Sequence, residues 1–329
     1  MNVVALVGAG YMAGVHANAW LAEGSAPISW VCSPSQRGRE LAARVGAQWT
    51  PSIEEVLADT SVTILDLCTP TGTHPFLVEA GIDGGRHVLV EKPIALDGTG
   101  AARIKDVYRR RRAGQVVMVA HVLQFFGGYQ RLIQAVDDDA IGQPACVMAT
   151  RFGEKPNWSR WITDPGQSGG PLVDLLVHDF DLANRLLGRP EAVTARETAG
   201  SYAVTVTYQE GRTALVTGGS ALPSGTPFSS SIQVVGSDGI LSHRFVAAAA
   251  DATVPDGQVD LLSSSGRQSL DVAPSDPYQS QIHYFLDCVA TGREPVAGSV
   301  DSAAAALGVS RAAVRSMTSG REEDPADAS

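Results

Sequence analysis

Short apolar runs alternate with amphipathic segments in the first third of the chain. Runs of strand length stand at residues 3–7, 28–32, 62–67, 87–90 and 116–119. Helices are expected at about 12–22, in the segment after residue 74 as far as about 82, and at about 100–112. Runs that are apolar throughout are typical of buried parallel strands, and strands that alternate with helices form right-handed crossovers. The pattern predicts a parallel sheet whose ligands bind at the carboxyl ends of its strands.

The pattern changes at about Gln124. We expect helices at 129–136, from Pro171 to Leu187, at 278–290 and at 302–317. Strands are expected at 145–151, 203–208, 213–217, 231–235, 240–245, 258–262 and 268–272. Turn signals such as residues 237–239 separate several strands, which predicts an open, largely antiparallel sheet. The helix that begins at Pro171 should cover one face, and the other face, if apolar, is a candidate subunit interface.

A chain of 329 residues exceeds what one core usually holds, so we expect two domains. Their predicted bounds are 1–123 and 124–329, with the last helices able to pack back on the first domain. The end of the chain, 318–329, is rich in acidic and small residues and is expected to be disordered.

Composition excludes several classes of function. A net charge of −10 argues against binding to nucleic acid. The four cysteines are far apart and show no metal or redox spacing, which favours a reduced cytoplasmic protein without a metal centre. No basic leader is present and no apolar run reaches about 18 residues, so neither secretion nor membrane insertion is indicated.

A glycine-rich turn follows the first apolar run. Residues 8–14, Gly-Ala-Gly-Tyr-Met-Ala-Gly, fit the pattern G-x-G-x-x-G/A with Ala13 in the third small position. The glycines permit a tight turn and let backbone N–H groups approach a pyrophosphate, while the next helix points its positive end at the phosphates. The turn predicts a dinucleotide site that uses Gly8, Gly10, Tyr11 and Met12.

The end of the second run bears on the adenosine ribose of that dinucleotide. NAD-binding proteins usually carry an acidic residue there, whereas residues 33–37 read Ser-Pro-Ser-Gln-Arg. An acid repels a 2′-phosphate, but hydroxyls and a guanidinium bind one. Ser33 and Arg37 therefore predict a preference for NADP over NAD.

Polar residues also end the later runs, at Thr69, Lys92 and His121. Lysines are most often ordinary surface residues, but Pro93 restricts the backbone beside Lys92. An X-Pro bond accepts the cis form at small cost. We expect a cis bond between Lys92 and Pro93, which would turn Lys92 toward the ligand.

The centre of the chain carries a carboxylate and an imidazole. Gly169-Gly170-Pro171 begins a helix on which Asp174 and His178 stand four residues apart and share a face. A carboxylate can fix the tautomer of a histidine and raise its basicity, as proton transfer near neutral pH requires. The alternative is a surface hydrogen bond, which is the commoner role of such a pair.

These residues resemble the Gfo/Idh/MocA oxidoreductases, the group of glucose–fructose oxidoreductase and inositol 2-dehydrogenase, over nearly the whole chain. The resemblance consists of residues 8–16, Thr69-Pro70 with His74, Glu91-Lys92-Pro93, and Gly169-Gly170 with Asp174, His178 and Asp181. It implies an α/β protein: a Rossmann NAD(P)-binding domain, then an α+β domain on an open, largely antiparallel sheet. The implied activity is hydride transfer between nicotinamide and a secondary alcohol or ketone of a sugar, cyclitol or related polyol.

The resemblance also assigns roles to residues. The implied catalytic residues are Lys92, Asp174 and His178. The expected cofactor contacts are Gly8, Gly10, Tyr11, Met12, Ser33, Arg37, Thr69, His74, Glu91, Lys92, Trp161 and Tyr278. The expected substrate contacts are Lys92, His121, Asp174, His178 and Asp181.

One departure from the family is Gln124-Phe125-Phe126, where many members carry an arginine. The missing acid after the second strand makes the chain more similar to NADP-using anhydrofructose reductases than to NAD-using inositol dehydrogenases.

Two alternative functions stay open, a catalytically silent sugar-sensing relative and an NAD-dependent glycosidase. The expected partners are a small polyol or keto-sugar and further copies of the chain, in a homodimer or homotetramer built through the second sheet.

Overall fold

The computed structural model describes residues 2–156, 161–247 and 258–327. The chain forms two compact units, one of Met1–Val122 with Pro277–Ala303 and one of Leu123–Asp276 with Ala304–Ser329. The first unit therefore combines the N-terminal part of the chain with a segment from near its end. The second unit begins one residue before the predicted boundary.

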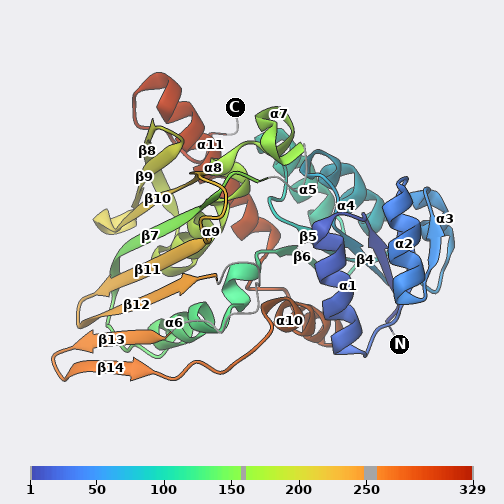
Figure 1. The fold of residues 1–329 in the computed structure, drawn as a ribbon, viewed down its shortest axis with the longest axis horizontal. Helices are drawn as coiled ribbons and strands as arrows, with labels where there is room; N and C mark the ends of the chain where they lie inside the picture. The colour runs from blue at the N-terminus through green and yellow to red at the C-terminus, as the bar shows by residue number, and fades with distance from the viewer. Residues whose placement is uncertain (1, 157–160, 248–257, 328–329) are drawn as a thin grey trace. The chain divides into compact units, whose positions relative to one another are not determined.

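A six-stranded parallel sheet in the order β3-β2-β1-β4-β5-β6 forms the centre of the first unit (Figure 1). Its strands are β1 (Val4–Val7), β2 (Ile28–Cys32), β3 (Gln48–Thr50), β4 (Ile64–Leu67), β5 (His87–Glu91) and β6 (Val117–Ala120). This is the strand order of Rossmann dinucleotide-binding domains. The predicted parallel sheet is confirmed, and β3 is an edge strand that the apolar pattern did not predict.

Helices connect these strands. The connecting helices are α1 (Tyr11–Glu23), α2 (Gln36–Val45), α3 (Ile53–Ala58), α4 (His74–Asp83) and α5 (Gly98–Arg109), and α10 (Pro277–Thr291), from near the end of the chain, belongs to the same unit. The strands β1 and β4 are buried at every position. The helix α10 packs along α1, so the C-terminal segment completes the helical layer beside β1 (Figure 1).

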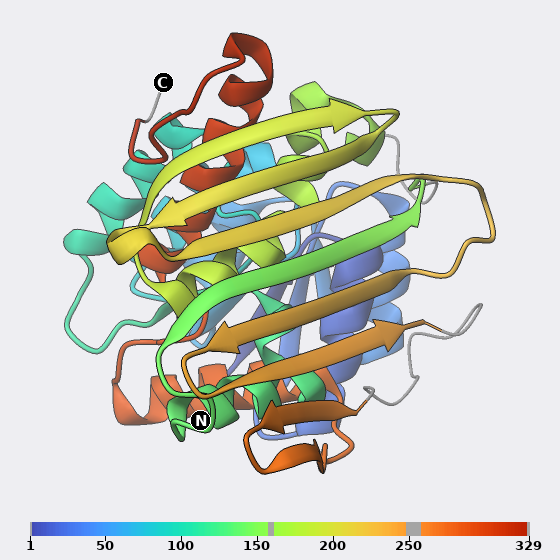
Figure 2. The same ribbon diagram turned by 90° about the vertical axis from the view of Figure 1, so that its left-hand side faces the viewer.

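The second unit is built on an eight-stranded sheet in the order β14-β13-β12-β11-β7-β10-β9-β8 (Figure 2). Its strands are β7 (Pro144–Glu154), β8 (Pro190–Thr198), β9 (Ser201–Tyr208), β10 (Thr213–Leu222), β11 (Ser229–Gly236), β12 (Gly239–Val246), β13 (Val259–Ser263) and β14 (Gly266–Leu270). Neighbouring strands are antiparallel except β7 and β10, which run parallel. The sheet is therefore open and largely antiparallel, as predicted.

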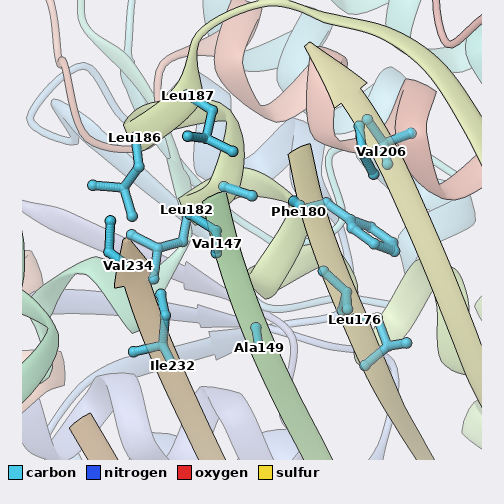
Figure 3. Close-up of a cluster of buried hydrophobic side chains, with 14 of the residues drawn as sticks. Val147, Ala149, Leu176, Phe180, Leu182, Leu186, Leu187, Val206, Ile232 and Val234 are labelled. Carbon is cyan, nitrogen blue, oxygen red and sulfur yellow. The ribbon is translucent and has the colours of Figure 1, made fainter. Parts of the chain in front are cut away.

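One face of this sheet carries the core of the second unit. The helices are α6 (Gly127–Asp137), α7 (Pro165–Ser168), α8 (Pro171–Asp174), α9 (Val177–Leu187) and α11 (Val300–Ser319). Phe180 and Leu187 of α9 are fully buried against Val147 and Val206 of the sheet (Figure 3). Burying one such side chain contributes about 1.5–3 kcal/mol, so this packing fixes α9 on β7 and β10.

Residues 318–327 are ordered, in contrast to the disorder expected for 318–329. The helix α11 continues to Ser319, and Glu323 exchanges two backbone hydrogen bonds of 2.9 Å with Val193 of the edge strand β8. The pairing satisfies backbone groups that an edge strand otherwise leaves open. Residues 328–329 lie outside the described residues. Among the described residues, no helix combines the length and apolarity needed to cross a membrane.

Candidate active site

The turn after β1 requires glycine at its first position. Gly8 has φ of +114°, and its N–H donates to the carbonyl of Cys32 at 2.8 Å. A Cβ placed on Gly8 would lie 2.2 Å from the carbonyl oxygen of Cys68. The backbones of β1 and β4 thus approach too closely at this turn for any side chain.

The helix α1 begins in open space beyond this turn. Its N-cap, Gly10, makes no side-chain cap hydrogen bond, and apart from its chain neighbours no described residue comes within 4 Å of where a Cβ would stand on Gly10. The first turn of the helix, which starts with the exposed Tyr11 and the half-buried Met12, contains no acidic residue. Unbonded N–H groups and the positive end of the helix dipole bind anions. The residues present therefore fit the pyrophosphate of a dinucleotide.

A second helix begins at the end of β2. Ser33 is buried, with its Oγ 3.0 Å from the Oγ of Ser35, which is the N-cap of α2. Arg37 lies exposed in the first turn of α2 and makes no hydrogen bond or ion pair to the residues that the structure describes. Arg39 by contrast stacks over Trp49 at 4.1 Å. The guanidinium of Arg37 is thus available to an anionic ligand.

His74 connects the turns that follow β4 and β5. Its ring is fully buried, with Nδ1 2.9 Å from the carbonyl oxygen of Pro93 and Nε2 3.0 Å from that of Thr69. Burial lowers the pKa of His74. The Oγ1 of Thr69 lies 2.7 Å from that of Thr73. These contacts favour a structural role for the His74 ring, which holds the two turns together, over a direct contact with cofactor.

The turn after β5 contains the predicted lysine. Glu91 ends the strand and is 6% exposed, and one oxygen of its carboxylate accepts the main-chain N–H of Lys92 at 3.0 Å. The peptide bond between Lys92 and Pro93 is cis, which confirms the prediction. Lys92 is half-buried. His121, one residue beyond β6, is fully buried.

A buried cluster behind this turn is not evident from the sequence pattern. His16 of α1 and Asp66 of β4 are both fully buried and form an ion pair of 2.9 Å. The other ring nitrogen of His16 lies 3.1 Å from Glu91. The ring of Tyr278, on α10, has its centroid 6.2 Å from that of His16. The sequence signal for the cluster is one acid inside an otherwise apolar strand.

The predicted helix of 171–187 is interrupted in the second unit. Pro171 begins α8 as predicted, but the carbonyl of Pro171 accepts both Leu175 N–H (3.0 Å) and Leu176 N–H (2.9 Å). Leu176, with ψ of −9°, then caps α9. Such a widened turn is frequent at functional sites. Asp174 thus ends α8 and His178 lies in the first turn of α9, and both are half-buried.

Two buried pairs hold the start of α9. Asp179 accepts two hydrogen bonds from Arg151 of β7, at 2.6 and 3.0 Å, and the two residues are 2% and 4% exposed. Asp181, also 2% exposed, accepts from the amide of Gln124 at 2.6 Å. Gln124 begins the segment predicted to depart from the family, and its side-chain amide is engaged by Asp181.

The candidate residues are distributed over both units. Lys92 belongs to the first unit, and Asp174 and His178 belong to the second. Trp161 is half-buried in a short 3₁₀ helix, Trp161–Thr163, of the second unit. Among the residues predicted to contact the nucleotide, Gly8, Ser33, Thr69 and Lys92 follow the carboxyl ends of β1, β2, β4 and β5, the edge at which such folds bind dinucleotides.

Solved structures similar to this chain share its fold across both units. GenD2 from gentamicin A biosynthesis, in complex with NAD, matches with a TM-score of 0.82 and 26% identity over 98% of this chain and 96% of that chain. Levoglucosan dehydrogenase, in complex with NADH and levoglucosan, matches with a TM-score of 0.86 at 18% identity, over 99% of this chain and 100% of that one. The second likeness shows the fold alone.

Sequence comparison leads to one family. Inositol 2-dehydrogenase of Rhizobium meliloti (strain 1021) is 28% identical over 96% of this chain and 97% of its own length. For 1,5-anhydro-D-fructose reductase of Ensifer adhaerens the identity is 28%, over 89% of this chain and 90% of that protein. Residues 3–121 match an oxidoreductase family with an NAD-binding Rossmann fold, and residues 129–242 match the Gfo/Idh/MocA C-terminal domain. The chain therefore belongs to the Gfo/Idh/MocA family of oxidoreductases.

Proposed function

We propose that the chain is an NAD(P)-dependent dehydrogenase or reductase that acts on a secondary alcohol or ketone of a sugar, cyclitol or related polyol. The names of the inositol dehydrogenase and anhydrofructose reductase relatives support this class of substrate. The observation that carries the proposal is that Lys92, Asp174 and His178 are all present, Lys92 at the end of a Rossmann strand and the other two at the break between α8 and α9. A silent sugar-sensing relative would have no need to keep all three.

Each of these residues has a distinct proposed role. When bound, the nicotinamide supplies the hydride acceptor or donor. His178 moves the proton of the substrate hydroxyl, and Asp174 orients its imidazole. The ammonium group of Lys92 stabilises the negative charge that develops on the same oxygen. The burial of Asp181 and its hydrogen bond to Gln124 favour a positioning role for its carboxylate over the expected direct contact with substrate.

A substrate screen tests the proposed activity. The full-length protein is mixed with oxidised or reduced cofactor and with cyclitols, pyranoses and keto-sugars, and nicotinamide absorbance is followed. We expect a change in absorbance with at least one member of these classes. Hydrolysis of a glycoside without net change in absorbance would instead identify the NAD-dependent glycosidase, and cofactor binding without turnover of any compound would identify the sensor.

We further propose that the enzyme prefers NADP. In support of this, Ser33 and Ser35 occupy the place of the usual acid, and Arg37 is exposed in the first turn of α2. A charge-assisted hydrogen bond to the 2′-phosphate is worth about 1.5–3 kcal/mol, or roughly one to two decades of affinity. Replacing Arg37 with Ala is expected to remove that preference and leave NAD binding unchanged.

Dissociation constants for both cofactors, measured by calorimetry, check this expectation. Arg39→Ala is the matched control, because Arg39 lies two residues along the same helix and stacks on Trp49. The control should keep the NADP to NAD ratio of the wild type. A wild type that binds NAD more tightly, or a ratio that Arg37→Ala leaves unaltered, would refute the NADP preference.

We also propose that the bare face of the eight-stranded sheet joins copies of the chain into a homodimer or homotetramer. Figure 2 shows that the helices of the second unit lie behind this sheet, and Leu215 of β10 is 42% exposed. Introducing a charge with Leu215→Glu is expected to reduce the mass of the assembly, because an unpaired charge is costly to bury. Light scattering on wild type and variant measures this mass, and a monomeric wild type would exclude the proposed assembly.

A further inference from the structure

Three ionisable residues, Asp66, His16 and Glu91, lie next to one another in the interior of the first unit. Asp66 comes from β4, His16 from α1 and Glu91 from β5, and their exposed fractions are 0%, 0% and 6%. The Nδ1 of His16 lies 2.9 and 3.0 Å from the two oxygens of Asp66. Its Nε2 lies 3.1 Å from an oxygen of Glu91. One imidazole therefore lies between two carboxylates on adjacent strands. It is hydrogen-bonded to Asp66 and lies within ion-pair distance of Glu91, without the alignment of a hydrogen bond to that carboxylate.

The surroundings of Asp66 favour an ionised carboxylate. Besides His16, it accepts from the indole N–H of Trp20 at 2.7 Å and from the thiol of Cys68 at 3.5 Å. A buried carboxylate stays charged only when donors and an opposite charge compensate for lost hydration. Indole and thiol are neutral, so among the described contacts of Asp66 the compensating charge falls on His16.

The imidazole has a carboxylate oxygen beside each nitrogen, and only the doubly protonated ring offers an N–H to both. Burial alone lowers the pKa of His16, but the interactions of the ring with Asp66 and Cys68 together outweigh burial and raise the pKa well above its ordinary value. The titratable groups that face the ring are Asp66 from β4, Cys68 directly after that strand, Glu91 from β5 and Tyr278 from α10.

The same atoms do not suit a metal ion. His16, Asp66 and Cys68 each offer a ligand atom within 4.8 Å of the others. However, the separations of 2.9–3.0 Å between nitrogen and oxygen are those of direct hydrogen bonds. Burial also raises the pKa of the Cys68 thiol far above its ordinary value, so the thiol keeps its proton.

The cluster of Asp66, His16 and Glu91 contacts the main chain of Lys92, the lysine assigned to the reaction. Glu91 presents one oxygen to His16 and the other to the main-chain N–H of Lys92 at 3.0 Å. We propose that His16 is a positioning residue, which as a buried imidazolium between Asp66 and Glu91 fixes the Glu91–Lys92 turn and thereby the place of the Lys92 ammonium group. This inference rests on the proposed function for the role of Lys92, but the charge on His16 is independent of it.

The charge is tested first, without any turnover. Nitrogen-15 NMR of the full-length protein distinguishes a doubly protonated imidazole from either neutral tautomer. An ordinary histidine is neutral at pH of about 8, since its pKa is near 6.5. We expect His16 to carry both protons at this pH. A neutral His16 ring there would overturn the proposal, whatever the substrate of the enzyme.

The positioning role is tested by kinetics. His16→Gln keeps hydrogen-bonding groups but removes the charge, and it is expected to lower kcat on the order of tenfold to a hundredfold, as small displacements of reacting groups do, with little change in KM for the cofactor. Trp20→Phe is the matched control: it removes a neutral donor to Asp66 from the same helix and should keep kcat within about threefold of wild type. Equal losses in both variants would mean that general loosening of α1 is responsible, which would overturn the proposal.

A second variant covers the case in which His16→Gln does not fold. The pair His16→Gln with Asp66→Asn leaves no unpaired charge at Asp66, so it should fold yet keep the reduced kcat. Recovery of wild-type kcat by this double variant would overturn the positioning role. Lys92→Met separates this result from the proposed function, since unchanged turnover in that variant refutes the role of Lys92 itself and not the charge on His16.

Discussion

Replacing Lys92 with Met is expected to lower kcat by roughly a hundredfold or more, the usual scale for losing a charge-stabilising group. Methionine has a similar length and no charge, so the change removes the ammonium group and little packing. Lys92 is half-buried at the end of β5, and its backbone contact with Glu91 does not involve the side chain. Fold and cofactor affinity should therefore survive.

His178→Ala should cause a comparable loss, because it removes the group proposed to move the proton. Lys105→Met and His283→Ala are matched controls, since Lys105 pairs with Asp301 and the side chain of His283 is 74% exposed. Steady-state rates at saturating substrate and cofactor measure the effect. Near-wild-type kcat in both Lys92→Met and His178→Ala would show that the assigned catalytic residues are wrong.

The second large effect is expected in stability. Asp179→Ala should destabilise the second unit by about 3–5 kcal/mol, because it leaves the charge of Arg151 buried and unpaired. The two side chains are 2% and 5% exposed and share two hydrogen bonds. The pair joins α9 to β7, so its loss also loosens the helix that carries His178.

Urea denaturation followed by circular dichroism measures this loss, read from the transition of the second unit. Arg185→Ala removes an exposed ion pair, in which the side chains of Arg185 and Asp137 are 34% and 50% exposed. It should lower the free energy of unfolding by only about 0–1 kcal/mol. The double variant Arg151→Met with Asp179→Leu should be more stable than Asp179→Ala, because no buried charge remains. If Asp179→Ala and Arg185→Ala shifted the transition equally, the buried pair would contribute no more to stability than the exposed pair does.

The central strands of the first unit could be predicted closely from sequence. The apolar run at 62–67 contains β4, Ile64–Leu67, and the run at 28–32 coincides with β2. Strands buried on both faces leave a continuous apolar signal. The edge strands β3 and β8 were missed because Gln48–Thr50 is short and polar, and β8 begins with Pro190 and Glu191. Both missed strands are partly exposed, whereas the edge strand β6 is buried at every position and was predicted from its apolar run.

The candidate site was predictable where a motif is local and not where it depends on distant contacts. Glycines at 8 and 10, Lys92 before a cis proline, and the glycine pair before Pro171 each stand out within a few residues. The pairing of His16 with Asp66 joins residues 50 positions apart, and that of Gln124 with Asp181 joins residues 57 apart. The break at Leu176 was also missed, since its sequence contains no glycine or proline.

Transfer of a hydride is tested most directly with a substrate that carries deuterium on the carbon to be oxidised. The protein is incubated with oxidised cofactor and a deuterated cyclitol or pyranose chosen from the substrate screen. The reduced cofactor is then isolated, and its molecular mass is measured by mass spectrometry. The proposed function predicts one deuterium on the nicotinamide for each molecule of ketone formed. Ketone formation without deuterium on the nicotinamide, or release of a hydrolysed sugar with no reduced cofactor, would contradict it.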